Sequence, residues 1–359
     1  MPTYLPPSDR LRSICLLRLS ALGDVTHVVP LIHTLQQRCP TTRLTWIIGK
    51  LEHRLVGDLA GVEFIVFDKS RGRHAYIELQ RTLKGRRFDV LLHMQVALRA
   101  NLASALIRAK QRIGFDAARA KDLHGLFVNQ RIAARSGEHV LDAFASFLEP
   151  LGIRQSELHW DIPLPDDAIK FAEKALPGKQ PTLLISPCSS HIKRNWRANA
   201  YAAVGDHAVR QHGWRVVLCG GRSALERQMG DAILAAMQQP AIDLIGRDTI
   251  KQLQALLSRA TAVLSPDSGP MHMANAAGTP VIGLHAASNP ARSGPYSERR
   301  FVVDRYDAAA RKYLGKPADA LPWGTKIEFD GVMDLIEVDA VIDALDRLVA
   351  TRAGPEQAP

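Results

Sequence analysis

Short apolar runs alternate with helical patterns along this chain, and this alternation begins twice. In the first half, apolar runs of strand length occupy 13–19 (SICLLRL), 43–49 (RLTWIIG), 61–68, 88–95 and 112–116, and helical periodicity separates most of them. Strands that alternate with helices favour a parallel sheet covered by helices on both faces. We therefore expect an α/β fold.

The same pattern restarts after a proline-containing segment at 163–181. Five further strand-like runs follow, at 181–190, 213–221, 241–246, 261–269 and 279–285. A length of 359 residues also suggests about two domains. We expect an N-terminal domain over 1–170 and a C-terminal domain over 171–335, then an amphipathic helix within 336–359 that ends in a frayed tail.

Composition narrows the class of protein and its compartment. No apolar run approaches the roughly 18 residues of a membrane span, and the N-terminus has no apolar core typical of a signal peptide. The cysteines are widely scattered without a C-x-x-C pair, which indicates buried thiols in a reducing compartment. We expect a cytoplasmic protein without a structural metal. The cysteines are Cys15, Cys39, Cys188 and Cys219.

The formal net charge is +10, and the densest basic stretch lies at 68–89 (DKSRGRHAYIELQRTLKGRRFD). Such a bias suits nucleic acid, an anionic membrane surface or a small acidic substrate, although a solvated helix face is an equally good explanation of any single arginine. The stretch lacks interleaved aromatic residues and any nucleic-acid motif, so a nucleic-acid-binding module is poorly supported.

Open parallel sheets bind ligands beyond the carboxyl ends of their strands, and the loop within 264–285 is chemically unusual there. A helix that begins near Gly269 would offer free N–H groups to phosphate, with Ser268 and His272 as further donors. Asp267 would repel phosphate, so it could accept hydrogen bonds from the loop backbone or from a ligand hydroxyl. The alternative is that Asp267 or Ser268 merely caps the helix. The loop matches no Walker A or G-x-G-x-x-G pattern.

A second loop, at 18–30 (RLSALGDVTHVVP), follows the first predicted strand. Gly23 would allow a tight turn, and Asp24 stands where a helix N-cap would be, a role worth roughly 1 kcal/mol. A carboxylate in that place could also take a proton from a hydroxyl nucleophile. Both interpretations remain open, and Pro30 makes the start of the helix uncertain.

A third polar loop follows the strand-like run that ends near Ser186. It carries serines and adjacent cations that suit phosphate, although the cations could also be solvated and Trp196 part of the core. These residues are Ser189, Ser190, Lys193 and Arg194.

Together these loops resemble glycosyltransferase family 9, the ADP-heptose lipopolysaccharide heptosyltransferases. The resemblance runs over about 13–348 and rests on LLRLSALGDVTHVVP, SSHIKRNW and SPDSGPMHMANAAGTPVIGLH. It implies a GT-B fold, with two Rossmann-like doubly wound domains facing a cleft. The N-terminal domain would take the acceptor and the C-terminal domain the nucleotide sugar, with the last helix packing back on the first domain.

The resemblance also assigns roles to residues. Asp24 would be the general base, with Gly23, Thr26 and His27 in the same acceptor-side loop. Arg194 stands where the family usually has lysine, which keeps the charge but leaves its division of labour with Lys193 open. The segment 311–329 has no clear counterpart. The implied donor- and phosphate-binding residues are Ser189, Ser190, Lys193, Arg194, Glu226 (expected near the nucleoside), Asp267, Ser268, Gly269 and His272.

The function implied is inverting transfer of heptose from ADP-L-glycero-D-manno-heptose to the Kdo region of the lipopolysaccharide inner core. The chain has no D-x-D motif, so we expect no metal and no cofactor besides the donor substrate. We expect an acidic lipopolysaccharide-precursor acceptor at the inner leaflet, no nucleic acid, and a cytoplasmic protein peripheral to the inner membrane. Alternatives are addition of the second heptose, another nucleotide sugar or acceptor, or a nucleotide-sugar epimerase or hydrolase on a GT-B scaffold.

Overall fold

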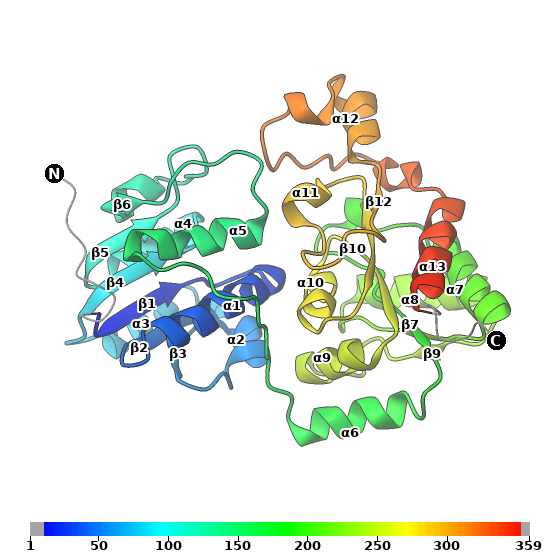
Figure 1. Ribbon diagram of the computed structural model, residues 1–359, viewed down its shortest axis with the longest axis horizontal. Coiled ribbons are helices and arrows are strands. Elements are labelled where there is room, and N and C mark those ends of the chain that lie inside the picture. The colour runs from blue at the N-terminus through cyan, green and yellow to red at the C-terminus, as the bar shows by residue number, and fades with distance from the viewer. Residues whose placement is uncertain (1–10, 353–359) are drawn as a thin grey trace. The chain divides into compact units, whose positions relative to one another are not determined.

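The computed structural model describes residues 11–352, and the chain divides into two compact units between Pro163 and Leu164. Each unit has its own six-stranded sheet (Figure 1). Every strand pairing in both sheets is parallel, so the predicted α/β class with two Rossmann-like halves is confirmed.

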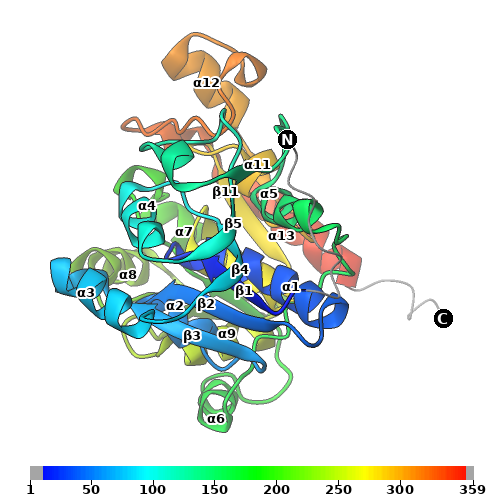
Figure 2. The ribbon, with the colours of Figure 1, turned by 90° about the vertical axis from the view of Figure 1, so that its left-hand side faces the viewer.

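The first unit consists of a sheet with helices on both faces. Residues on one face of the sheet pack with α3 and α4 in a continuous apolar cluster, while α1 packs with α5 (Figure 2). The strands are β1 (Ser13–Leu17), β2 (Arg43–Gly49), β3 (Val62–Phe67), β4 (Phe88–His93), β5 (Ala109–Gly114) and β6 (Gln130–Arg131). The helices are α1 (Leu22–Arg38), α2 (Lys50–Val56), α3 (Arg73–Thr82), α4 (Leu98–Ala105) and α5 (Val140–Ala145).

The second unit repeats this plan. Helices α7, α8 and α13 lie on one side of its sheet and α9 and α10 on the other (Figure 1). Its strands are β7 (Thr182–Ile185), β8 (Arg215–Leu218), β9 (Ile242–Asp243), β10 (Ala262–Pro266), β11 (Val281–His285) and β12 (Val303–Asp304). Its helices are α6 (Asp166–Ala175), α7 (Ala198–His212), α8 (Ala224–Ala236), α9 (Ile250–Arg259), α10 (Gly269–Ala276), α11 (Pro290–Ser293), α12 (Tyr306–Leu314) and α13 (Val338–Arg352).

Both sheets have the same topology. The first has the order β3-β2-β1-β4-β5-β6, and the second, read from its other edge, has β9-β8-β7-β10-β11-β12. In each sheet the chain moves outward over three strands and then returns to the first one to continue on its other side. This order places a ligand crevice at the carboxyl ends of the two central strands, where the direction of winding reverses. These switch points are β1/β4 and β7/β10.

The structure moves one predicted domain boundary and gives the last helix another packing partner than predicted. A boundary at 170/171 would divide α6, which packs on α9 of the second unit, so the division lies at Pro163/Leu164 instead. The last helix was expected to pack back on the first domain. Instead it packs on α7 within the second unit, because its buried residues join the apolar core of that unit. The predicted frayed tail falls on 353–359, outside the described residues.

Each strand-like run of the sequence forms a strand, while the two-residue strands β6 and β12 were not predicted. Within 11–352, no helix is both long and apolar enough to cross a membrane.

Candidate active site

The switch point of the first unit carries an ion pair between Arg18 and Asp24. Arg18 follows β1, and its guanidinium also donates to the carbonyl oxygen of Met94, which follows β4, over 2.5 Å. The side chain of Asp24 is 29% exposed and that of Arg18 only 12%. The carboxylate therefore stays open to solvent while the cation beneath it is fixed between the two central strands.

The local structure differs from the prediction at Gly23 and Asp24. Helix α1 begins at Leu22 with Ala21 as its N-cap, so Gly23 is helical and forms no separate tight turn. Asp24 lies in the first turn, where one carboxylate oxygen accepts from the backbone N–H of Ala21 at 3.2 Å. Asp24 is thus a capping residue but not the N-cap, and the positive end of the helix stabilises its charge.

Arg18 is a residue that sequence reasoning missed. Its guanidinium lies over the ring of Phe144 from α5, with the Cζ atom 5.1 Å from the ring centroid. A buried arginine is retained where it has a partner, because an unpaired buried charge is costly. A cation directly after the first buried strand and six residues before Asp24 was the available signal.

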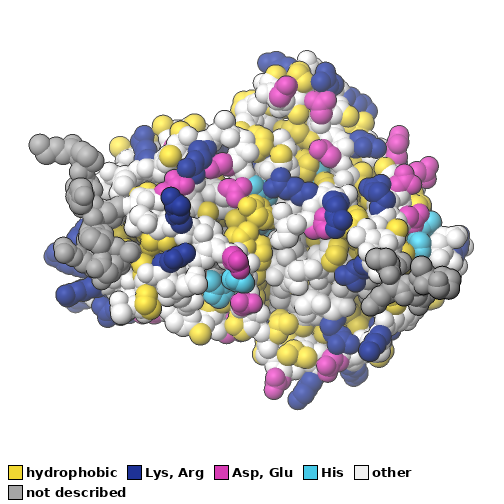
Figure 3. All heavy atoms as spheres, in the orientation of Figure 1, with side chains coloured by type: hydrophobic (Ala, Val, Ile, Leu, Met, Phe, Trp, Pro, Cys, Tyr) yellow, Lys and Arg dark blue, Asp and Glu magenta, His cyan; other side chains and the backbone are white. Residues whose placement is uncertain are grey.

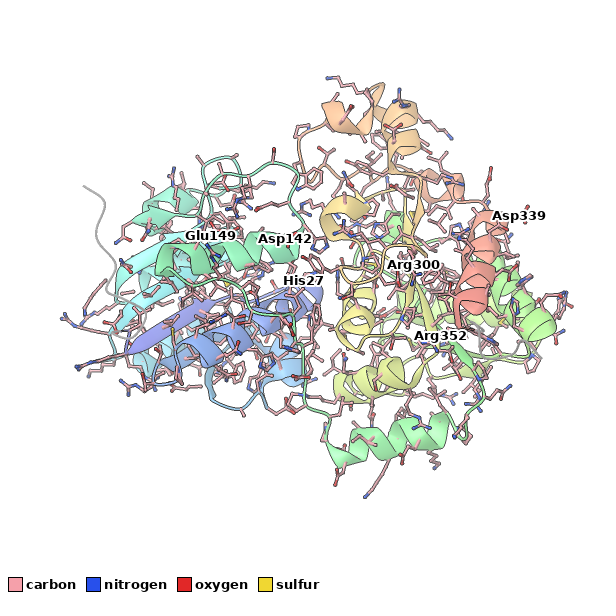
Figure 4. All side chains as sticks on the ribbon, viewed as in Figure 1. His27, Asp142, Glu149, Arg300, Asp339 and Arg352 are labelled. Atoms are coloured by element: carbon pink, nitrogen blue, oxygen red, sulfur yellow. The ribbon has the colours of Figure 1, made fainter. Side chains whose placement is uncertain are left out.

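Thr26 and His27 of the predicted acceptor-side loop both lie inside the first unit. The hydroxyl of Thr26 is fully buried and donates to the carbonyl of Gly23 at 2.7 Å. His27 is nearly buried on α1, and its ring meets that of His139 edge to face at 5.4 Å. Figure 4 shows His27 on α1, with Asp142 on α5 and Glu149 beyond it. Thr26 and His27 are therefore buried parts of α1, two and three residues after Asp24.

A pocket of about 300 Å³ lies at the carboxyl ends of β1, β2 and β3. Lys50 and Asp68 form an ion pair of 2.9 Å there, and hydrogen bonds from Ser70 and Lys50 lower the pKa of Asp68 to about 2. Gly49 is required at the wall, because a Cβ atom would stand 2.2 Å from the carbonyl oxygen of Leu19. The pocket is rich in cations, which are Lys50, Arg54, Lys69 and Arg99.

In the second unit, the loop after β10 forms a helix start as predicted. Ser268 is the N-cap of α10, and its hydroxyl accepts from the backbone N–H of Met271 at 3.4 Å. Gly269 is the first helical residue, and the hydroxyls of Ser265 and Ser268 lie 2.8 Å apart. A helix start with a nearby hydroxyl can bind anionic oxygens, and this one stands at the β7/β10 switch point.

Asp267 lies in a cluster of donors that the sequence did not reveal. Its carboxylate accepts from Lys326 Nζ at 2.7 Å and from the Ser293 hydroxyl at 3.3 Å, and His272 Nε2 stands 3.7 Å away. Burial alone would raise the pKa of Asp267, but the His272 imidazole and the Lys326 ammonium outweigh it and hold the pKa well below its usual value. Asp267 therefore remains a carboxylate that gathers cationic donors beside the start of α10.

Burial lowers the pKa of a second imidazole near this cluster. His285, at the end of β11, is fully buried, and this lowers its pKa to about 4 even though Asp267 acts in the opposite direction. Its Nδ1 pairs with the hydroxyl of Ser288 at 3.1 Å. His285 is therefore neutral at pH 7 and contributes no charge to the loop.

The cations of the loop after β7 each pair with a carboxylate from 328–330. Arg194 Nε donates to Glu328 at 2.7 Å, whereas Lys193 reaches the largely exposed Asp330 at 3.3 Å. Trp196 is core, as one interpretation of the sequence held, and its indole N–H donates to the carbonyl of Ile336 at 3.0 Å. Arg194 is the more buried of the two cations and the better held.

The two predicted serines of this loop differ in exposure. The Ser189 hydroxyl accepts from the backbone N–H of His191 at 3.2 Å, and the Ser189 N–H donates to Asn195 at 2.7 Å. Ser190 is exposed to solvent. Ser189 thus shapes the loop, while Ser190 remains exposed.

The segment around 326–328, which had no counterpart in the sequence comparison, joins both loops of this switch point. Lys326 pairs with Asp267 after β10, and Glu328 pairs with Arg194 after β7. Between them, Ile327 is fully buried and its N–H donates to the carbonyl of Ala287 at 2.9 Å. The structure therefore assigns this segment to the candidate site, a placement that no local pattern predicts.

Glu226 lies after β8 in the first turn of α8. Its carboxylate accepts from the Gly221 N–H and from the Ser223 hydroxyl, each at 2.7 Å. Asp248, after β9, is another residue that the sequence did not single out. Burial and then the nearby Glu226 charge raise the pKa of Asp248 to about 7. Acidic groups thus follow β8 and β9, beside the cationic groups that follow β7 and β10.

Comparisons with known proteins agree with this geometry. Residues 76–323 match the family model of glycosyltransferase family 9 (heptosyltransferase). Over 337 residues, the chain is 40% identical to the lipopolysaccharide core heptosyltransferase OpsX of Haemophilus influenzae, covering 94% of this chain and 97% of that protein.

Solved structures show the same fold. A family 9 glycosyl transferase from Veillonella parvula superposes with a TM-score of 0.79 at 23% identity, covering 95% of this chain and 98% of that one. The E. coli heptosyltransferase WaaC with ADP superposes with a TM-score of 0.72 at 17% identity, covering 94% and 99%.

Proposed function

This chain belongs to glycosyltransferase family 9, and we propose that it transfers heptose from ADP-L-glycero-D-manno-heptose to the Kdo region of the lipopolysaccharide inner core, with inversion at the anomeric carbon. The likeness to a lipopolysaccharide core heptosyltransferase over nearly the full length of both chains supports heptose as the transferred sugar. The observation that carries the assignment of the donor site is the convergence of Lys326, Arg194 and the start of α10 at one switch point.

The second unit binds the donor in this proposal. The diphosphate lies at the start of α10, where the Ser268 hydroxyl and the backbone N–H groups donate to its oxygens. Arg194, Lys193 and Lys326 supply positive charge as the bond to the leaving diphosphate breaks, and His272 supplies a further hydrogen-bond donor. Donors that are already in place when negative charge develops stabilise a transition state without reorganisation. Glu226 and Asp248 stand at β8 and β9 as partners for nucleoside hydroxyls or base nitrogens.

Asp24 is the proposed general base. An acceptor hydroxyl attacks the anomeric carbon from the face opposite the diphosphate, a new C–O bond forms as the old one breaks, and the proton goes to Asp24. Arg18 pairs with this carboxylate, and Asp24 lies in the first turn of α1, so both contacts hold Asp24 in place to receive the proton as the attacking oxygen bonds.

An acidic acceptor fits the first unit. The cations around the pocket at β1 to β3 can pair with the carboxylates of Kdo and with phosphates of the lipid precursor. The same positive charge favours binding to the anionic cytoplasmic leaflet, because each Lys or Arg near the membrane surface strengthens binding by roughly 1 kcal/mol. We therefore propose that the enzyme works in the cytoplasm, peripheral to the inner membrane.

We also propose that the transfer needs no metal ion. In metal-dependent transfer the ion holds the diphosphate and neutralises the leaving group. Here four cationic or imidazole side chains can do so, and the buried Asp267 is already paired with Lys326. Activity in EDTA equal to that in magnesium supports this proposal, whereas activity lost in EDTA and restored by magnesium contradicts it.

One experiment tests donor, acceptor and base together. Wild type and Asp24→Ala are each incubated with ADP-heptose, deacylated Kdo-containing lipid A and EDTA, and the products are read by mass spectrometry. We expect one added heptose with the wild type and almost none with the variant. A wild type that modifies only an acceptor already carrying one heptose contradicts the Kdo assignment. Hydrolysis or epimerisation of the donor without acceptor contradicts transfer.

A further inference from the structure

A cluster of metal-ligating side chains lies outside the candidate active site, where α7 packs on α13. His207 and His212 from α7 both direct Nε2 at the same oxygen, Oδ1 of Asp346 on α13, at 2.8 and 2.6 Å. Figure 3 shows His side chains beside carboxylates on this side of the second unit. Among the described residues, this is the group of three whose ligand atoms all lie within 4.8 Å of one another.

The residue types and their spacing suit a first-row transition metal. Zinc takes imidazole nitrogen and carboxylate oxygen at about 2.0–2.2 Å, so two of its ligand atoms stand roughly 3.3–3.5 Å apart. The three ligand atoms all lie within 4.8 Å of one another, so small side-chain rotations can bring them to that spacing. Metal would replace two N–H···O bonds with three bonds to one ion, since both imidazoles would then offer a lone pair.

Burial agrees with a site that is shaped yet reachable. The side chains of His207 and His212 are about one-fifth exposed and that of Asp346 is less than half exposed. The two rings stand edge to face with centroids 5.4 Å apart, and the ring of Trp214 lies 6.4 Å from that of His212. Packing therefore fixes the ring planes, while solvent can supply the remaining coordination positions.

We propose that His207, His212 and Asp346 bind one divalent transition metal of the zinc class, which joins α13 to α7. Oxygen-seeking magnesium is a poor match, because two of the three ligands are imidazoles. The ion is structural, which departs from the expectation drawn from the cysteines, because histidine and aspartate side chains supply the ligands here. His207 lies nine residues into α7, about 14 Å along the helix from its start near the loop after β7, so the metal stands far from the reacting groups.

The site has a consequence for the last helix. α13 is the C-terminal element of the described chain, and its apolar face completes the core of the second unit. Figure 4 shows Asp339 and Arg352 towards its opposite ends, and Asp346 lies between them in sequence. A ligand that binds only the folded state stabilises that state, so bound metal would hold α13 in place.

The test uses the full-length chain without a histidine tag, stripped with EDTA and dialysed. Zinc titrated by calorimetry should bind at one equivalent with a micromolar or tighter Kd, and cobalt should give visible d–d absorption. Asp346→Asn should weaken zinc binding at least tenfold and His207→Gln with His212→Gln at least a hundredfold. Magnesium should not bind. Zinc should raise the thermal midpoint of the wild type by a few degrees and leave that of the double variant unchanged.

The matched control is His159→Gln, which removes an exposed histidine of the first unit and should bind zinc as the wild type does. If the double variant fails to fold, His212→Gln alone with the cobalt spectrum replaces it. Equal zinc affinity in the wild type and the ligand variants overturns the proposal, as does no binding by the wild type. Heptosyl transfer measured in EDTA separates this site from the proposed function, because neither result depends on the other.

Discussion

The two sheets of this protein share one strand order but differ in the charge that they place at the switch point. At β1/β4 the exposed group is a carboxylate, Asp24, whose cation is buried beneath it. At β7/β10 the groups nearer solvent are cations, Lys326 and Lys193, and the deeply buried group is the carboxylate Asp267. The same topology thus presents a solvent-accessible carboxylate in one unit and solvent-accessible cations in the other.

The difference arises from loops and not from strands. In both units the strands bring two loops to the same edge, because parallel strands all end there. Whether the cation or the carboxylate of a pair is exposed depends on the other contacts of each group, because a buried charge needs a partner. Arg18 finds Asp24 and Met94 in the first unit, whereas Asp267 finds Lys326 and Ser293 in the second.

The variant expected to have the largest effect on this difference between the two units is Asp24→Asn. It keeps the shape of the side chain and an acceptor for the Ala21 N–H but removes the proposed proton acceptor. We expect kcat for transfer to fall by about 10²–10⁴, the usual range for a lost general base, with little change in the KM for the donor. Steady-state kinetics with both substrates measure this. Retention of more than a tenth of kcat would assign Asp24 to structure alone.

Asp267→Asn tests the buried carboxylate of the second unit. It leaves Lys326 without its partner, and we expect a loss of about 3 kcal/mol in the free energy of unfolding, as when a buried pair is broken. The pKa of Asp267 in the folded state lies below its unfolded value of about 3.9. The ionised carboxylate therefore adds to the free energy of unfolding above that pH, and this stabilisation is lost as pH falls through the folded pKa. Urea unfolding of the wild type and the variant at pH 7 and pH 3 measures the loss of stability and its pH dependence.

The control for that variant is Asp330→Asn. Asp330 pairs with Lys193 but is 93% exposed, so its loss should change the free energy of unfolding by less than about 0.5 kcal/mol. If both variants are equally stable at pH 7, the cluster at Asp267 does not hold the loop.

Arg194→Ala and Lys193→Ala settle which cation binds the donor. Arg194 is more buried and better held, and a charge-assisted hydrogen bond is worth about 1.5–3 kcal/mol, so its loss should raise the donor KM roughly 30-fold. Lys193 is half-buried and pairs with an exposed carboxylate, so we expect less than about a fivefold rise for its loss. Isothermal titration with ADP gives the same comparison without turnover. The reverse order of effects would assign the phosphate to Lys193.

The smallest expected effect belongs to Glu328→Gln. Glu328 shares Arg194 with any bound phosphate, so its removal should strengthen the field at the diphosphate and lower the donor KM about threefold, a change below about 1 kcal/mol. The rate at saturating donor should stay unchanged. A higher donor KM would mean that Glu328 positions Arg194 and does not compete with the donor.

Local patterns predicted the strands well and the partners of the charged residues poorly. The run at 13–19 and the loop at 264–285 were read correctly because periodicity, glycine, proline and capping residues act within a few positions. Lys326 was missed because it lies 59 residues from Asp267 along the chain, and Glu328 because it lies 134 residues from Arg194. Asp24 was predicted to be the N-cap but is the third helical residue, because nothing local shows that α1 starts at Leu22.

The sequence by itself determined two parallel α/β sheets, the polar loops after their central strands and the family to which the chain belongs, because short-range patterns encode each of these. Only the tertiary structure decided that 326–328 joins the loops after β7 and β10 and that Arg18 pairs with Asp24. It also decided that α13 completes the second unit and brings Asp346 to His207 and His212. The physical reason is that a buried charge or apolar face needs a partner in contact with it. That partner is the group nearest in space, and the distance along the sequence does not predict which group that is.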